Sequence, residues 1–462
     1  MSPELDVAVI GAGVAGLTTA HELRRAGLEV RVFEEQPYVG GRMHSFRHDG
    51  YVLDEGAEQI SERGYRATWE LLTRLSVPDH HVPRIGKAIG VWRAGRAHAG
   101  VADPVALLSG AALSPRARLD LVRFLAWTAL HHRGFDGDHP ERTPAGPATV
   151  ARFARRYHRD VHDYLLQPVA GCFFGWDTAR SAAAPLISLM NDVGPVSGWR
   201  TYHDGMDLLA RRLADGLDVA LGTPVHEVVE DGDGVRLHGP GGTVTARAAV
   251  LCVPAPIAAR LHGKAPEDEQ AFLTACTFTP TLKVSCLLDR PLAPVSHKPL
   301  YALLTPDAVD DVLSGIIVDH AKHPGRAPAG KGLLTLMADP RRIPELRGTP
   351  DAETADRLVR AATRYIPGLD TARRRHFVHA FRHGLPEVTP EALHHRPRFM
   401  ARPPRPVEYA GDWVMLRPAS EAAVRSGALA ASRVLSRLRP SPASRTPRPA
   451  VAAPRSDACE TA

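Results

Sequence analysis

Residues 7–35 read VAVIGAGVAGLTTAHELRRAGLEVRVFEE, and this stretch decides the fold. The apolar run at 7–10 is typical of a short buried strand. A helix-compatible segment continues to Ala26, and Gly27 suits the residue just past a helix C-terminus. Residues 28–33 form a second apolar run. The stretch therefore predicts a β-α-β unit at the start of a parallel sheet.

The turn between the first strand and the helix carries a G-x-G-x-x-G motif. Gly11 permits the tight turn, Gly13 lets a pyrophosphate approach the backbone, and Gly16 allows close packing of helix and strand. Ala15 lies inside the same motif, at the helix N-terminus that attracts phosphate. Glu34 ends the second strand, at the spacing where a carboxylate accepts hydrogen bonds from ribose hydroxyls. We therefore expect dinucleotide binding rather than a glycine-rich turn without a ligand.

Length and composition bound the remaining possibilities. The chain has 462 residues, of which 44% are apolar and 23% are charged. This length predicts two or three compact units or one large interleaved one. The composition excludes a collagen, a coiled coil and a wholly disordered chain.

Charge and cysteine usage narrow the partners and the compartment. Lys and Arg outnumber Asp and Glu by 57 to 51, but the arginines are scattered, so we expect no nucleic-acid partner. An anionic substrate or a membrane surface stays open. The five cysteines show no C-x-x-C spacing, so neither disulfides nor a zinc site are expected. With no signal peptide and no spanning segment in the sequence, a cytoplasmic protein is expected.

The region 76–200 reads as Pro-punctuated helices with little strand character. Within it, residues 116–130 place Leu121, Phe124, Leu125 and Thr128 on one helical face. The simplest interpretation is a helix that packs on its own domain. The alternative is an interfacial helix in peripheral contact with a membrane.

The rest of the chain mixes strands and helices before a polar end. We expect a β-meander over 219–237, a buried strand at 248–253, further strands at 282–288 and 332–337, and helices at 353–365 and 418–438. The Pro-, Arg-, Ala- and Ser-rich residues 439–462 cannot bury a core and are expected to be disordered.

Two segments just after the β-α-β unit carry a family resemblance. Gly40-Gly41-Arg42 follows Glu34 closely, and Asp54-Glu55-Gly56-Ala57 comes next. With these segments the sequence resembles the FAD-dependent superfamily of amine oxidases, protoporphyrinogen oxidases and carotenoid/squalene desaturases. The resemblance implies that Gly40, Gly41 and Arg42 line the FAD pyrophosphate and flavin. It also implies that the backbone of Gly56 and Ala57 lies beside the isoalloxazine.

Later segments resemble the same superfamily in the same order. Residues 204–209 (DGMDLL) resemble its G-G-M-x-x-L segment, with Asp in place of the first Gly. The resemblance implies that the backbone of Val225 meets the adenine, and that Gly411 and Asp412 contact the ribityl and phosphate region. Residues 420–427 (SEAAVRSG) match the C-terminal signature, except that Ala422 stands where the family has Gly.

The C-terminal helix has a predicted role in its own right. Because Pro418 suits the first turn, the backbone N–H groups near Glu421, Ala422 and Ala423 are expected to be unpaired. At a flavin they would stabilise the negative charge of the reduced ring.

Candidates for contact with the substrate are few. Lys283 matches the superfamily lysine that holds a water near flavin N5, and the alternative is an edge-strand lysine that points to solvent. We expect Trp413 and Met415 either to line a pocket or to pack in the core. His376, His379 and His383 have no carboxylate or cysteine at ligand spacing, so no metal site is expected.

The expected fold class is α/β, with a Rossmann-type FAD-binding domain interleaved with a mixed α+β substrate domain. We expect residues 1–75, 201–270 and 386–438 in the FAD domain, and 76–200 and 271–385 in the substrate domain.

The expected reaction is dehydrogenation of a small molecule, with hydride transfer to flavin N5. Gly411-Asp412-Trp413 together with Pro418–Glu421 resembles the desaturases, which favours an apolar isoprenoid or polyene substrate. An amine or a tetrapyrrole is the alternative. Two further alternatives are a flavin-dependent isomerase and a flavin-free module that binds prenylated proteins. The electron acceptor, oxygen or a quinone, stays open.

Overall fold

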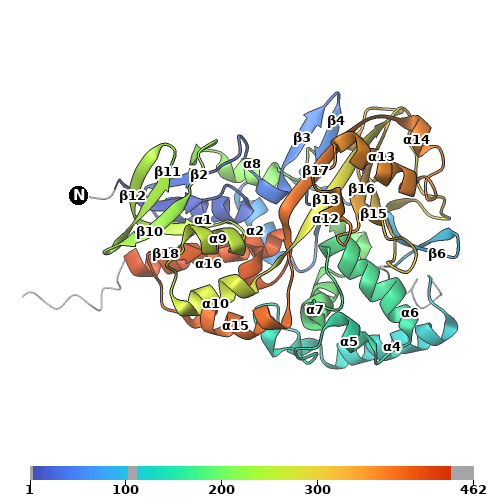
Figure 1. Ribbon diagram of the computed structural model, residues 1–462, viewed down its shortest axis with the longest axis horizontal. Helices are drawn as coiled ribbons and strands as arrows, with labels where there is room; N and C mark the ends of the chain where they lie inside the picture. The colour runs from blue at the N-terminus through green and yellow to red at the C-terminus, as the bar shows by residue number, and fades with distance from the viewer. Residues whose placement is uncertain (1–3, 102, 104–111, 439–462) are drawn as a thin grey trace, which may run out of the picture.

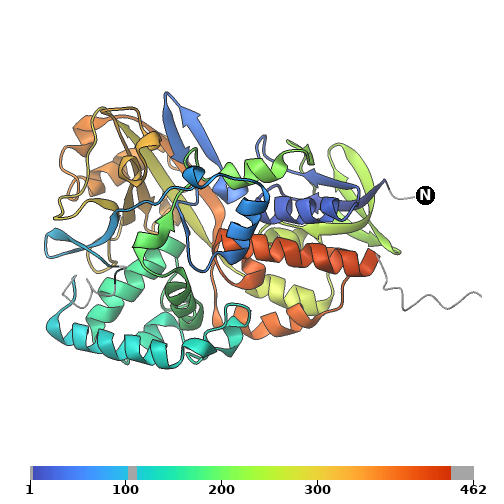
Figure 2. The ribbon, with the colours of Figure 1, turned by 180° about the vertical axis from the view of Figure 1, so that it is seen from behind.

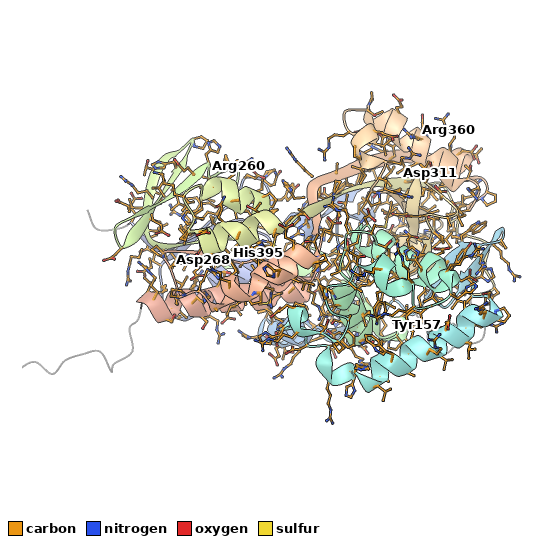
Figure 3. All side chains as sticks on the ribbon, turned by 60° about the horizontal axis from the view of Figure 1, so that its bottom comes forward. Tyr157, Arg260, Asp268, Asp311, Arg360 and His395 are labelled. Atoms are coloured by element: carbon orange, nitrogen blue, oxygen red, sulfur yellow. The ribbon has the colours of Figure 1, made fainter. Side chains whose placement is uncertain are left out.

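The computed structural model of the chain describes residues 4–101, 103 and 112–438. Two seven-stranded sheets form the centres of two lobes, and a helical layer lies below the second lobe (Figure 1). Arg260 and Asp268 project from the first lobe, and Asp311 and Arg360 from the second (Figure 3). The predicted disordered tail, 439–462, lies outside the described residues.

The first sheet contains the predicted β-α-β unit. Its strand order is β10-β11-β12-β1-β2-β9, and β18 pairs with β12. The strands are β1 (Leu5–Ile10), β2 (Val30–Phe33), β9 (Asp218–Ala220), β10 (Glu227–Asp231), β11 (Gly234–Gly239), β12 (Gly242–Leu251) and β18 (Val407–Tyr409). β12, β1, β2, β9 and β18 run parallel, so their carboxyl ends meet at one edge. The meander predicted over 219–237 is wrong in its bounds: β10, β11 and β12 form an antiparallel extension over 227–251, whereas β9 pairs parallel with β2 at the other end of the sheet.

Helices cover both faces of this sheet. One face carries α1 (Val14–Arg25), α2 (Arg66–Arg74), α8 (Leu208–Ala214) and α16 (Ser420–Leu438), and the other α9 (Ala255–Leu261), α10 (Glu267–Ala275) and α15 (Pro390–Ala401). The red α16 runs beside the blue α1 in Figure 2. A Cβ on Gly427 would lie 2.5 Å from the Ala15 carbonyl oxygen, so a glycine is required where these helices touch. The helix predicted from Pro418 begins two residues later, at Ser420.

The second sheet has the order β17-β13-β16-β15-β14-β6-β7. Its strands are β6 (Ala88–Arg93), β7 (Arg96–Ala99), β13 (Phe278–Leu288), β14 (Leu300–Leu304), β15 (Leu313–Val318), β16 (Gly332–Ala338) and β17 (Arg373–Pro386). α13 (Asp351–Ala362) packs on it, close to the helix predicted at 353–365. The expectation of little strand structure in 76–200 is wrong for β6 and β7. Ala94 and Gly95 join them in a two-residue turn, both with positive φ.

The helical layer contains α4 (Pro115–Leu130), α5 (Val150–Ala154) and α7 (Ala183–Val193). On α4, Leu121, Phe124 and Thr128 are buried as predicted, and Leu125 is half-buried. Figure 3 labels Tyr157 beside this helix, and its ring packs on that of Phe124 with centroids 5.7 Å apart. Among the helices of the described residues, we find none with the length and hydropathy that a bilayer-spanning segment requires.

The hairpin of β3 (Ser45–His48) and β4 (Tyr51–Asp54) connects the lobes. It follows the nucleotide-binding unit in sequence, but Tyr51 and Leu53 pack with Leu287 and Leu333 of the second sheet. The Tyr51 hydroxyl donates to the Leu288 carbonyl at 3.1 Å. We propose that the chain divides into an FAD domain and a substrate domain at the boundaries given above. In this division the hairpin belongs to the FAD domain and reaches into the substrate domain.

Candidate active site

The predicted cofactor motifs follow the carboxyl ends of the parallel strands. Gly11 comes directly after β1 and Glu34 directly after β2, and one residue separates Gly411 from the end of β18. Gly11 has φ 103°, and a Cβ there would lie 2.9 Å from the Cys252 carbonyl oxygen. Ligands of parallel sheets bind in the crevice outside these strand ends.

Hydrogen bonds join the separate motifs into one surface. The Gly40 amide donates to the Ala12 carbonyl at 2.9 Å, so the GGR segment lies against the glycine turn. The Ala57 amide donates to the Arg42 carbonyl, also at 2.9 Å. The Arg42 guanidinium donates to both carboxylate oxygens of Asp412, at 2.8 and 2.9 Å. The structure therefore brings together segments that lie up to 400 positions apart in the sequence, from Ala12 to Asp412.

Glu34 is fixed at the edge of this surface. Its carboxylate accepts from the Ala12 amide at 2.6 Å and from the Gln36 amide at 2.9 Å. Burial raises the pKa of this carboxyl above its usual value, although the two hydrogen bonds act to lower that pKa. The Glu34 carbonyl accepts from the Thr223 amide at 2.7 Å, which places the segment of Val225 nearby. Val225 was expected in a strand, but it lies in the segment between β9 and β10.

The glycines give a direct test of whether the residues fit an extended dinucleotide. A Cβ on Gly13 would meet no atom within 4 Å, although the residue sits at the N-terminus of α1. Space for a ligand therefore lies ahead of that helix. A Cβ on Gly56 would lie 2.1 Å from the Arg42 carbonyl oxygen, so this contact requires glycine. A carboxylate such as Glu34 has further lone pairs for ribose hydroxyls, so the residues fit FAD.

The N-terminus of α16 differs from the expectation. The amides of Ala422 and Ala423 donate to the Ala419 carbonyl at 3.0 and 3.3 Å, so they are not unpaired. The Glu421 carboxylate accepts from the Ala67 and Thr68 amides at 3.0 and 2.9 Å, and so caps α2. The reason is a preceding turn at 416–419, which bends the chain so that Ala419 is available as an acceptor.

Trp413 belongs to the core. It is fully buried, and its indole N–H donates to the Val253 carbonyl at 3.1 Å. Met415 is buried beside Arg396. Packing thus accounts for both side chains, which the sequence left open between core and pocket.

Lys283 lies on the second sheet and faces the first lobe. β13 is flanked by β17 and β16, so it is not an edge strand, and Lys283 is only 3% exposed. Its ammonium donates to the Gly56 carbonyl at 2.7 Å and pairs with Glu58. The solvent-facing alternative is therefore wrong.

The three histidines share β17 but not one environment. His379 is buried, and its Nε2 lies 3.1 Å from the Ser285 hydroxyl oxygen. Burial, with the nearby Lys283 charge, lowers the pKa of His379 to about 4, so the ring is neutral at physiological pH. His376 and His383 are half-buried.

Sequence reasoning missed Glu58, which pairs with Lys283, and also Lys322 and Asp319, which extend the same buried cluster. Two signals could have found Glu58 and Lys322. Glu58 directly follows the D-x-G-A segment, and Lys322 is one of only six lysines in the chain.

Fold and site together define a two-lobed protein whose nucleotide-binding motifs meet at the strand ends. The model of the family described as flavin containing amine oxidoreductase matches residues 14–435. The chain belongs to this family, which confirms the expected superfamily, the fold class and FAD as the cofactor.

Individual relatives cover several chemistries. Over 167 residues the chain is 30% identical to protoporphyrinogen oxidase 2 of Arabidopsis thaliana, covering 36% of this chain and 32% of that protein. Over 52 residues it is 46% identical to a 4,4'-diapophytoene desaturase of Staphylococcus haemolyticus, covering 11% and 10%. The solved structure of a putrescine oxidase triple mutant is similar with a TM-score of 0.77 at 18% identity, covering 94% of this chain and 99% of that one. The last similarity concerns the fold.

Proposed function

We propose that the protein is an FAD-dependent oxidoreductase that dehydrogenates a small apolar substrate. The observation that carries the proposal is that the glycine turn, the GGR segment, the D-x-G-A segment and Asp412 are bonded into one surface. Lys283 contacts this surface at the Gly56 carbonyl. FAD supplies the hydride acceptor there, at flavin N5. The chain's own residues bind and orient the two reactants and exclude water.

Each part of the cofactor has proposed partners. Gly11, Gly13, Ala15 and Gly16 would hold the pyrophosphate at the N-terminus of α1, where the helix dipole favours anions. Glu34 would accept from the adenosine ribose, and the Val225 backbone would meet the adenine.

The flavin half would lie toward the second lobe. Gly40, Gly41 and Arg42 would line its phosphate side, with Gly411 and Asp412 at the ribityl chain. Gly56 and Ala57 would border the ring, and Glu421, Ala422 and Ala423 would lie near its far edge. Lys283, the proposed catalytic residue, would hold a water at flavin N5.

Side chains beside Lys283 and Arg42 support an apolar substrate over a cationic amine. Met337 lies directly opposite Lys283 in the β13–β16 register and so shares its face. The half-buried Phe278 ring lies 5.8 Å from the Arg42 guanidinium carbon. The carboxylate beside Lys283, Glu58, is paired with two lysines and offers no free charge to an ammonium group.

We further propose that α4 makes peripheral contact with a membrane, where an apolar substrate would dissolve. Leu119, Val122 and Leu130 are 66%, 47% and 82% exposed on this helix. Arg116 and Arg123 are exposed beside them and would meet anionic lipid headgroups.

The cofactor is tested by the absorbance spectrum of the purified protein, which should show bound flavin. A colourless protein that takes up no added FAD would contradict the proposal. The substrate class is tested by anaerobic incubation, in which a polyene or isoprenoid should bleach the flavin absorbance and simple amines should not. Bleaching by amines alone, or by a tetrapyrrole alone, would instead identify that compound class as the substrate.

The mass of the product separates dehydrogenation from isomerisation. A dehydrogenated product is lighter than the substrate by the mass of two hydrogen atoms, and we expect this loss. A product of unchanged mass would instead identify a flavin-dependent isomerase.

A further inference from the structure

The chain uses lysine sparingly, and the location of its lysines is uneven. Of its 57 Lys and Arg residues, 51 are arginine and only six are lysine. Four of the six are exposed: Lys87, Lys264, Lys298 and Lys331. The other two, Lys283 and Lys322, are 3% and 1% exposed and belong to one buried cluster. Both buried lysines of this arginine-rich chain therefore lie at one place, beside a buried arginine, Arg326.

Lys322, on α11 (Asp319–Lys322), is held by three carboxylates. Its Nζ lies 2.9 Å from Asp54, 2.6 Å from Glu58 and 3.1 Å from Asp319. Burial alone would lower the pKa of Lys322, but the three carboxylates outweigh it and raise the pKa above its usual value. An ammonium with three donors suits three convergent acceptors, whereas the planar fork of arginine does not.

Glu58 joins this cation to Lys283. One of its carboxylate oxygens accepts from Lys322 and the other from Lys283. The same Lys283 ammonium donates to the Gly56 carbonyl. Glu58 thus has no oxygen left unpaired, and its position is fixed from two sides.

The cluster is balanced in charge and anchored in both lobes. Arg326 donates to Asp54 at 2.7 Å, so three cations face three carboxylates. Asp54 also accepts from the Ser45 hydroxyl and the Met206 amide. On the other side, the Thr335 hydroxyl donates to Asp319 at 2.8 Å. The cluster is therefore held by β3, β4, β16 and the segment before α8.

We propose that Glu58 and Lys322 are positioning residues that hold the Lys283 ammonium against the Gly56 carbonyl. Lys322 holds one carboxylate oxygen of Glu58 in place, and the other oxygen in turn holds Lys283. This inference rests on the proposed function, because Lys283 matters at that carbonyl only if the flavin lies beside Gly56.

The test is NMR of the FAD-loaded protein carrying ¹⁵Nζ-labelled lysine, in which six lysines give few signals. We expect two ammonium signals protected from solvent exchange, assigned to Lys283 and Lys322 by their loss in Lys283→Met and Lys322→Met. In Glu58→Gln, the Lys283 signal should shift or broaden into exchange, while the Lys322 signal stays because Asp54 and Asp319 still hold it. An unchanged Lys283 signal in Glu58→Gln would overturn the proposal.

A matched control and a second variant keep the result unambiguous. Glu269→Gln removes another fully buried carboxylate, bonded to Arg402 and Arg405, and should leave both lysine signals in place. If Lys322→Met does not fold, Lys322→Met with Asp319→Asn restores the charge balance. It should still shift the Lys283 signal, and no shift would overturn the proposal.

The flavin provides a readout that a merely structural role would not change. Glu58→Gln removes a negative charge beside Lys283, so the midpoint potential of the bound flavin should become more positive, and Glu269→Gln should not change it. No difference between the two variants would count against the proposal. If the protein binds no FAD but Lys283 still responds to Glu58→Gln, the positioning holds and the proposed function fails.

Discussion

Replacing Lys322 by Met should destabilise the folded protein strongly. The substitution keeps the volume of the side chain but removes the cation that three buried carboxylates share. Breaking a buried ion pair from one side costs about 3–5 kcal/mol, because an uncompensated charge is left in the interior. We expect a loss of this size in the free energy of unfolding at pH 8.

The loss should depend on pH, with a sign that the structure fixes. In the wild type, burial raises the pKa of Asp54, but Arg326 and Lys322 outweigh burial and hold that pKa below its usual value. The ionised Asp54 therefore contributes to the free energy of unfolding above about pH 4, and this contribution is lost at lower pH. Without Lys322, the pKa of Asp54 loses one of the two charges that lower it, and the pKa of Asp319, which burial already raises above its usual value, should rise further. The variant's stability then falls as pH rises through these values. The difference from wild type should therefore be smaller at pH 5 than at pH 8.

The assay is urea unfolding of both proteins at the two pH values. Lys331→Met removes an exposed lysine and should change the free energy of unfolding by less than about 0.5 kcal/mol. Adding Asp319→Asn to Lys322→Met should recover part of the loss and reduce the pH dependence. A Lys322→Met protein that matches wild type in stability, or whose deficit is the same at both pH values, would refute the electrostatic reasoning.

Three other predictions concern the cofactor, the catalytic residue and the membrane. Gly13→Val places a side chain where a Cβ meets no protein atom within 4 Å, so the protein should still fold. Its bound flavin, measured as flavin absorbance per protein, should fall at least tenfold. The control Gly241→Val also fills open space, but in a hairpin turn, and should keep its flavin. Lys283→Met should slow the reoxidation of reduced flavin by oxygen in stopped-flow measurements, and unchanged kinetics would reject its catalytic role. Leu119→Asp should weaken co-sedimentation with anionic vesicles, whereas Val295→Asp, at another exposed apolar residue, should not; equal binding of the two would exclude α4 as the contact.

Local sequence was sufficient for the elements whose signals are short-range. The run at 7–10, the glycine turn and Gly27 identified β1, α1 and the turn between α1 and β2, because each depends on neighbours only a few residues away. The hairpin of β6 and β7 was missed, since its strands are short and its Ala94-Gly95 turn lacks the usual Asn-Gly or Asp-Gly sequence. The resemblance to a family supplied the later motifs, which carry no pattern of their own.

Several contacts of the site could not be read from the sequence. The helix rule correctly started α16 near Pro418, but it could not show that Ala419 accepts from the first amides or that Glu421 caps α2. The same holds for Lys283, whose partner Glu58 lies 225 positions away.

By itself, the sequence determined the nucleotide-binding unit and the helical face of α4, because backbone geometry and periodicity act over a few residues. The type of cofactor came from the family that its later motifs resemble. Only the tertiary structure shows that Lys283 is buried and that Lys322 pairs with three carboxylates. Both facts depend on which charged side chains come together in the interior. A buried charge is stable only when it is paired there, and Asp54 and Glu58 reach Lys322 from a distant part of the chain.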